Sequence, residues 1–171
     1  MTLNVGNKVV YPSQGPCLIG AVVKKTVGGT PISFYKLALL DEKGGDLFVP
    51  VDKVTSVGLR QLLEKSDIPK LLGHLKNAAV ADTNWKQRMI DNAKLLASGS
   101  AFDLAQVIES LTDLNKTKVL TPRDRQTLDR ARKILICEIS EVTGETKTAA
   151  EEQLEKALEL RKDAVSNRKK G

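Results

Sequence analysis

The residues of this sequence best suited to chemistry are those that could touch nucleic acid. The stretch "TNWKQRMIDN" places the only tryptophan of the chain, Trp85, beside two cations, Lys86 and Arg88. A flat aromatic ring can stack on any exposed base, whatever the DNA or RNA sequence, and a neighbouring cation can contact phosphate oxygens. The composition and spacing of this stretch therefore suit a contact with nucleic acid.

A helical wheel leaves two interpretations of Trp85 open. Trp85 lies at the edge of an expected apolar arc, and Arg88 lies next to it on the polar side of the same helix. The arc consists of Met89, Ile90, Ala93, Leu96 and Ala97. Because a side chain in the first helical turn can lean back beyond the helix end, Trp85 is either a core residue or an exposed aromatic.

A second group of cations lies between Lys116 and Lys133, where seven cations meet two acids and give a local net charge of +5. On the helix expected there, three cations share one face and two flank the apolar arc at its other edge. They are Arg123, Arg130 and Lys133 on the first face, and Arg125 and Arg132 on the second. Separately placed arginines suit phosphate contacts that position a duplex without reading it. A solvated polar helix face is the alternative.

Groups for catalysis are scarce in this chain. His74 is the single histidine and lies within a helical pattern, which favours a structural role over that of a base or ligand. No nucleophile stands in a recognisable base motif, and Cys17 and Cys137 form no CxxC pair, so we expect buried free thiols. We therefore expect no enzyme, no catalytic residue, no metal site and no cofactor.

Apolar runs between turn residues predict a β-rich beginning. The runs are "NKVVY", "CLIGAVVKK", "SFYKLALL" and "DLFVPV". The pairs Gly28-Gly29 and Gly44-Gly45 supply the positive φ that hairpin turns need. Four or five short strands in so short a segment predict a small, strongly bent barrel of the SH3 or Tudor type.

From Leu59 onward the apolar period becomes helical, and capping residues mark the helix ends. The expected helices run from Ser66 or Asp67 to Leu75, from Thr83 or Asn84 to Gly99, from Ser100 over "AFDLAQVIESLTDL", from Thr121-Pro122 to about Val142, and from about Thr148 to Val165. The predicted fold is α+β in two domains. An N-terminal all-β SH3/Tudor-like barrel spans 1–57, and a C-terminal all-α helical bundle spans 58–171 and ends in a basic tail.

Four motifs, in this order, resemble the CarD/CdnL family of bacterial transcription regulators. They are "VGNKVVYPSQG" (Val5 to Gly15), "VPVDKVTSVGLR" (Val49 to Arg60), "NWKQR" (Asn84 to Arg88) and "RARKIL" (Arg130 to Leu135). The resemblance runs from about Val5 to the last helix. It implies a Tudor-like N-terminal domain that binds the β subunit of RNA polymerase, related to a domain of the transcription-repair coupling factor.

The resemblance also implies a DNA contact. In this family the helical half meets promoter DNA at the upstream edge of the transcription bubble, where a tryptophan wedges into the minor groove. Trp85 would be that wedge, and Arg88 its companion on the phosphate side. Gln87 and Ile90 stand where relatives are often basic, which shifts the expected DNA contact toward Lys86 and the helix that carries Arg123 and Lys133.

The residues expected to bind polymerase lie in the β-rich half. They are Lys25, Tyr35 and Phe48. Lys25 stands where relatives can carry arginine, and Phe48 replaces a basic residue of some members. Apolar packing or pairing along an edge strand is therefore an expected part of the contact.

The predicted function is that of a transcription factor that binds the RNA polymerase β subunit and stabilises the open promoter complex, largely without sequence preference. A basic RNA- or ribosome-associated SH3-like module is the alternative, and a protein adapter for acidic partners is the third hypothesis. No run of residues has the length of a membrane span, and the first residues lack a signal sequence. We expect a monomer in the bacterial cytoplasm, at the nucleoid, with no membrane partner.

Overall fold

The first half of the chain forms an antiparallel sheet in the computed structural model, which describes residues 3–76 and 84–170, with the backbone alone for Trp85 and for 162–170. The strands are β1 (Lys8–Tyr11), β2 (Gly15–Val27), β3 (Thr30–Leu39), β4 (Asp46–Pro50) and β5 (Arg60–Gln61), in the spatial order β4-β3-β2-β1-β5. The long hairpin of β2 and β3 closes at the pair Val27↔Thr30. Gly28 and Gly29 form its turn with φ of 59° and 82°, which confirms the predicted glycine turn.

The core of this sheet is a cluster of apolar side chains. It contains Leu3, Val9, Cys17, Ile19, Leu37, Val49 and Leu59, all buried. Along β2, from Cys17 to Lys24, more buried residues alternate with more exposed ones, as the period of a strand requires. The predicted all-β, Tudor-like N-terminal unit is confirmed.

The sheet extends beyond the predicted domain boundary at Val57. A short 3-10 helix, η1 (Val51–Lys53), and a single turn, α1 (Val54–Val57), follow β4. The chain then returns to the sheet, where β5 pairs with β1 through Val9↔Gln61 and Val10↔Arg60. The β-rich unit therefore runs through Gln61, because β1 offers β5 a free edge on the side opposite β2.

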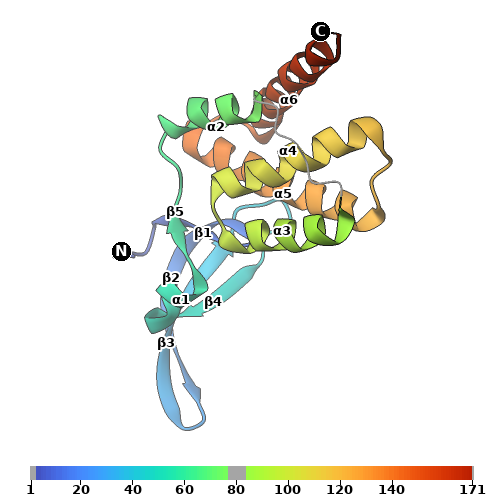
Figure 1. Cartoon of the computed structure of the whole chain (residues 1–171). Coiled ribbons are helices and arrows are strands. Elements are labelled where there is room, and N and C mark those ends of the chain that lie inside the picture. Colours follow the sequence, from blue (N-terminus) through green and yellow to red (C-terminus); the bar gives the residue numbers. More distant parts are fainter. Residues whose placement is uncertain (1–2, 77–83, 171) are drawn as a thin grey trace.

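Five helices build the second half of the described chain. They are α2 (Asp67–Lys76), α3 (Trp85–Ser98), α4 (Ala101–Thr117), α5 (Pro122–Thr143) and α6 (Lys147–Lys170). Figure 1 shows these helices gathered at one end of the sheet, while the β2–β3 hairpin points away from them and the end of α6 projects on the opposite side. The predicted helical C-terminal half is confirmed.

Capping residues begin the helices where the sequence predicts them. The side chain of Asn84 accepts from the backbone N–H groups of Lys86 and Gln87 at 3.1 and 3.4 Å. Ser100 and Thr121 accept in the same way from the residues three positions on. These bonds satisfy N–H groups that a helix leaves unpaired in its first turn, and they place the start of each helix.

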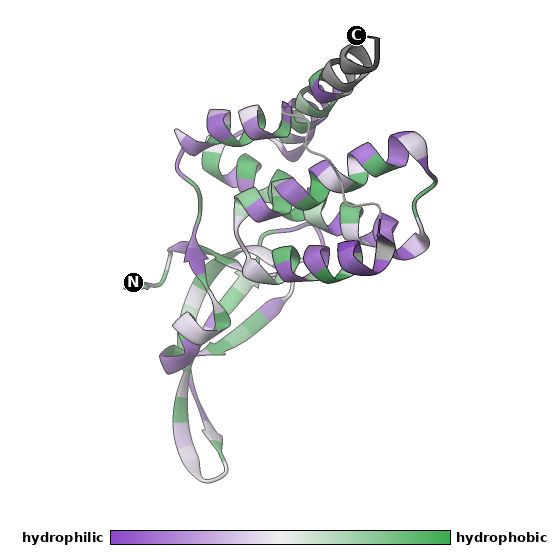
Figure 2. Ribbon diagram, viewed as in Figure 1, coloured by the Kyte–Doolittle hydropathy of each residue, from purple (hydrophilic) through white to green (hydrophobic). Residues whose placement is uncertain are grey.

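Apolar residues from all five helices meet in a second core, separate from that of the sheet. On α5, the buried residues Ala131, Leu135 and Ile139 face inward, and Leu128 and Val142 pack at the edges. This confirms the apolar arc predicted for α5. Figure 2 shows the underlying pattern, with hydrophobic residues recurring between hydrophilic ones along α4 and α5.

The two halves are joined through Arg60 and Glu138. The Arg60 guanidinium donates to both carboxylate oxygens of Glu138, at 2.8 and 2.6 Å, and its Nε donates to the Gly99 carbonyl at 2.5 Å. The backbone N–H of Leu63 donates to the same carboxylate at 2.9 Å. Since the Glu138 side chain is fully buried, this is a bidentate ion pair inside the interface between β5 and α5.

The single histidine and the two cysteines, which could have suggested catalysis, lie in contacts or burial typical of structural residues. Nδ1 of His74 lies 2.5 Å from Oε1 of Glu109, whose side chain is buried and whose pKa burial raises. Cys17 and Cys137 are buried free thiols, as predicted, and burial raises their pKa values to about 12 and about 11. Within the described ranges, no helix combines the length and the apolar character needed to cross a membrane.

Candidate nucleic-acid and protein interfaces

The first residue of α3 is Trp85, as the sequence predicts. The Asn84 cap holds this helix start in place, and Gly99 ends the helix with φ of 76°. The side chain of Trp85 lies outside the described part of the structure, so the choice between a core residue and an exposed aromatic stays a prediction. Lys86, the next residue, is exposed.

The face of α3 that packs on the bundle differs from the predicted arc. Arg88 and Asn92 are buried, at 5% and 6% exposure, whereas Ile90 is 51% exposed. Ala93 and Ala97, also expected inside, are exposed as well. The predicted inward arc of α3 was therefore wrong in these positions, although Leu96 does pack against the helical core.

An ion pair explains why a polar face of α3 turns inward. Nη2 of Arg88 lies 3.2 Å from Oδ2 of Asp124, a buried residue in the first turn of α5. A buried charge needs a partner, and Asp124 supplies it. The predicted contact of Arg88 with phosphate stays a prediction, and the structure places this side chain beneath the surface.

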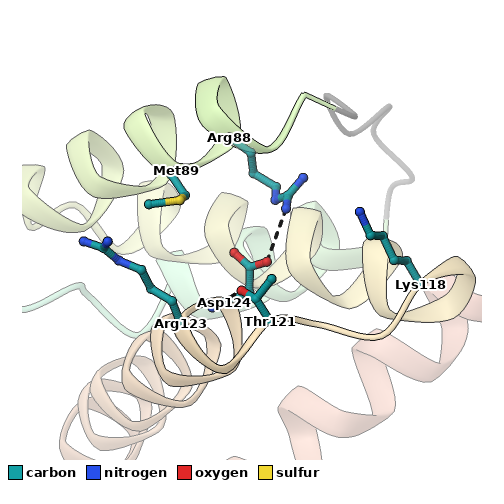
Figure 3. A pocket seen from close by; sticks show the side chains of 6 residues that line it. All are labelled: Arg88, Met89, Lys118, Thr121, Arg123 and Asp124. Atoms are coloured by element: carbon teal, nitrogen blue, oxygen red, sulfur yellow. Dashed lines mark hydrogen bonds and ion pairs between the residues drawn. The ribbon is translucent and has the colours of Figure 1, made fainter.

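A pocket of about 510 Å³ opens beside this ion pair. Arg88 and Met89 of α3 line it, together with Lys118, Thr121, Arg123 and Asp124 from the end of α4 and the start of α5. In Figure 3, Arg88 points from α3 toward the start of α5, with Lys118 and Arg123 on either side. Arg88 of "NWKQR" thus shares one site with Lys118 and Arg123 of the basic stretch, although they lie far apart in the sequence.

The predicted cations of α5 fall into two groups. Arg123, Arg125 and Lys133 are exposed, and no ion pair of theirs occurs within the described residues. Arg130 donates to the carbonyl of Ser13 in the loop between β1 and β2. Arg132 pairs with Glu155 of α6. The second group therefore holds α5 against its neighbours, and the first group is the one open to a ligand.

One residue that the sequence reasoning did not select is Lys118. It is the C-cap of α4 and precedes the Thr121 cap of α5, so it lies near the N-terminus of α5. Two features of the sequence could have pointed to Lys118: it belongs to the basic stretch, and it lies three positions before the predicted cap Thr121. The neighbouring Val119 is 78% exposed.

The predicted polymerase-binding residues divide between the two faces of the sheet. Nζ of Lys25 lies 3.8 Å from the centroid of the Phe48 ring, which is 42% exposed. Both belong to the outer face, where an exposed aromatic and a cation form a cation–π pair. Tyr35 packs instead against the core of the sheet, and its hydroxyl lies 3.4 Å from the Leu3 carbonyl.

Comparisons with known proteins match both halves of the chain. Residues 3–63 match the CarD-like/TRCF RID domain, and residues 70–155 match the CarD, C-terminal domain. The chain is 24% identical over 144 residues to the "Putative transcription factor YdeB" of Bacillus subtilis (strain 168). This alignment covers 83% of this chain and 93% of that protein. It is also similar to the solution NMR structure of the 72-residue N-terminal domain of Myxococcus xanthus CarD, with 38% sequence identity and a TM-score of 0.30. This match covers 35% of this chain and 79% of that chain.

The two domain matches follow each other along the chain in the order of the motifs quoted above. The first covers the sheet through β5, and the second begins within α2 and ends within α6. The chain therefore belongs to the CarD-like family of transcription factors.

Proposed function

We propose that this protein binds the β subunit of RNA polymerase through its β-rich half and stabilises the open promoter complex through its helical half. Trp85 is the wedge in the minor groove at the upstream edge of the bubble. The observation that carries the proposal is that Trp85 is the first residue of the capped helix α3, about one turn before Arg88, whose side chain contacts Asp124 at the start of α5. The protein acts as a monomer and performs no catalysis in this role.

The physical reason for such a wedge is stacking. A ring inserted at a base step opposes reclosure of the duplex and contributes about 1–3 kcal/mol per stacked base, whatever the base. The exposed cations Arg123, Arg125 and Lys133 supply the phosphate contacts that hold the helical half on DNA. The protein thereby recognises an open fork, which is a shape, and needs no base-specific contact.

Tethering makes a weak DNA contact sufficient. When the sheet is bound to polymerase, the helical half meets the promoter at a high effective concentration. The Arg60–Glu138 pair supports this arrangement, since a rigid joint between the halves restricts where Trp85 can reach. Lys25 and Phe48 on the outer face of the sheet are the proposed polymerase contacts, and Tyr35, which packs against the core of the sheet, is the third proposed contributor.

Promoter opening by polymerase, measured with and without the full-length protein, tests the proposal. Trp85→Ala should weaken the stabilisation of the open state by roughly five- to 150-fold, which corresponds to about 1–3 kcal/mol of lost stacking. Ile90→Ala is the matched control, because it removes a large apolar side chain that is 51% exposed from the same helix. Its effect should be small.

Thermal melting of the same variants separates a wedge from a core residue. If Trp85 is a wedge, Trp85→Ala melts close to the wild type and still binds polymerase. A core tryptophan would instead cost about 3–5 kcal/mol of folding stability and disable every function together. Normal melting combined with normal promoter opening would contradict the proposal.

A further inference from the structure

The loop between β1 and β2 packs on the end of α3. Pro12 in this loop is buried, and so is Gly99, the C-cap of α3. A Cβ placed on Gly99 would lie 3.1 Å from Cγ and 3.2 Å from Cβ of Pro12. The same Cγ lies 3.4 Å from the position of a Cβ on Gly58, the C-cap of α1. The Pro12 ring therefore lies directly against the backbone of Gly99, an approach that a residue with a side chain would not permit without a shift.

The rest of this loop is held by α5. Arg130 donates to the carbonyl of Ser13, and a Cβ placed on Gly15, which follows the loop, would lie 3.6 Å from Cγ1 of Ile134. Ser13 has φ of 65°, a left-handed conformation that is uncommon for a residue other than glycine. Such a conformation persists where the surrounding contacts hold it. The loop that presents Pro12 to α3 thus has a defined position on the helical half.

Helix α3 meets the sheet at the end remote from Trp85 (Figure 1). Besides the Pro12 contact, the Gly99 carbonyl accepts from Nε of Arg60 in β5 at 2.5 Å. The helix has 14 residues, so at 1.5 Å per residue its first residue lies about 20 Å from this contact. A helix is a rigid element, and a shift at one end is therefore transmitted to the other.

We propose that Pro12 and Gly99 are positioning residues, which fix α3 on the sheet so that polymerase bound to the sheet brings the first residue of α3 to the promoter. This inference rests on the proposed function, from which it takes the wedge and the polymerase contact. The Arg60–Glu138 pair joins the sheet to α5, whereas the Pro12 contact acts on the helix that carries the wedge. Orientation matters here, because a misplacement of about 1 Å can remove much of an interaction that depends on geometry.

Gly99→Ala and Gly144→Ala form a matched pair of variants. Both glycines are helix C-caps with φ of 76°, so both substitutions introduce the same backbone strain. They differ in what the new Cβ meets. At Gly99 it meets the Pro12 ring, whereas at Gly144 it meets no atom of the described residues within 4 Å. Any effect of Gly99→Ala beyond that of Gly144→Ala therefore reports on the Pro12 contact.

Spin labels on Gln87→Cys in α3 and on Lys53→Cys beside β4, both exposed positions, measure the distance between α3 and the sheet in the full-length protein. The two native cysteines are buried, so we expect them to remain unlabelled. Double electron–electron resonance should give one distance distribution in the unsubstituted and Gly144→Ala backgrounds, and a shifted or broadened one with Gly99→Ala. Pro12→Ala, which removes the ring without adding a clash, should broaden it as well. Unchanged distributions with both Gly99→Ala and Pro12→Ala would overturn the inference.

Promoter opening by polymerase tests the consequence. Gly99→Ala should lower the stabilisation of the open state at least about threefold relative to Gly144→Ala, a part of the loss expected for Trp85→Ala. Its affinities for the polymerase β subunit and for a short DNA duplex with an unpaired bubble should change less than about twofold, whereas a general loss of folding would lower both.

The outcomes separate this inference from the proposed function. A shifted spin-label distance with normal opening in Gly99→Ala, while Trp85→Ala lowers opening, would overturn the positioning role. If Trp85→Ala has no effect on opening, the proposed function falls. The placement of α3 by Pro12 is then decided by the spin-label distance alone, because that measurement involves neither polymerase nor DNA.

Discussion

Replacement of Arg60 by alanine tests how much the buried ion pair between the two halves contributes to the stability of the fold. In the wild type, Glu138 is fully buried and accepts three bonds, two from the Arg60 guanidinium and one from the Leu63 N–H. Arg60→Ala leaves this carboxylate with the Leu63 bond alone. Removal of one partner of a buried pair costs about 3–5 kcal/mol, because the remaining charge is left uncompensated.

The loss should be near the lower end of that range, since the Arg60 side chain is 23% exposed and water can enter after truncation. A loss of about 3 kcal/mol is still a large part of the roughly 5–15 kcal/mol by which a native protein is stable. Urea unfolding followed by circular dichroism measures this loss from the shift of the midpoint at constant slope.

Two further variants make the measurement decisive. Lys8→Ala breaks the exposed pair of Lys8 with Glu141 at the same interface and should cost about 0–1 kcal/mol. Arg60→Ala/Glu138→Gln removes the stranded charge and should be more stable than Arg60→Ala alone. A cost below about 1 kcal/mol for Arg60→Ala, or a double variant no more stable than the single one, would refute the reasoning.

Three other predictions concern charge and reactivity. Arg125→Glu combined with Lys133→Glu should flatten the dependence of log DNA affinity on log salt, whose wild-type slope should be roughly −3 to −4 for three to five engaged phosphates; an unchanged slope in a salt titration would count against these contacts. Burial raises the pKa of Glu109 above its ordinary value of 4.5, so the native state binds this proton more tightly than the unfolded chain does, and the associated stability is lost as pH rises through the raised pKa. The unfolding free energy of the wild type relative to Glu109→Gln should therefore decrease as pH rises from 4.5, and a difference that stays constant in urea titrations across pH would contradict this. Burial holds the thiol pKa values of Cys17 and Cys137 at about 12 and about 11, so an aromatic disulfide reagent at pH 8 should modify them only after denaturant is added; rapid modification of the native protein would show that these sites are open.

The sequence alone determined the positions at which the helices begin and end. Asn84, Ser100 and Thr121 cap the helices predicted for them, and each bond joins residues two or three positions apart. The glycine turn at Gly28-Gly29 is equally local. Such features are readable because both partners of the interaction lie within one turn of chain, so no distant segment can change the outcome.

Tertiary structure decided which charged residues are available to a ligand. Arg88 lies inside because Asp124, 36 positions away, supplies its counter-charge, and a helical wheel that weighs only hydropathy cannot anticipate such a partner. Arg130 shares the predicted helix face of Arg123, and Arg132 shares that of Arg125, yet Arg130 contacts Ser13 and Arg132 contacts Glu155.

The same reason applies to the sheet. The position of β5 beside β1 depends on a free strand edge that is created by the rest of the fold. The contact of Lys25 with Phe48 joins β2 to β4 across the intervening β3, a neighbourhood that arises from strand order and twist. Local spacing determines elements, whereas burial and pairing of charges are properties of segments that meet only in the folded chain.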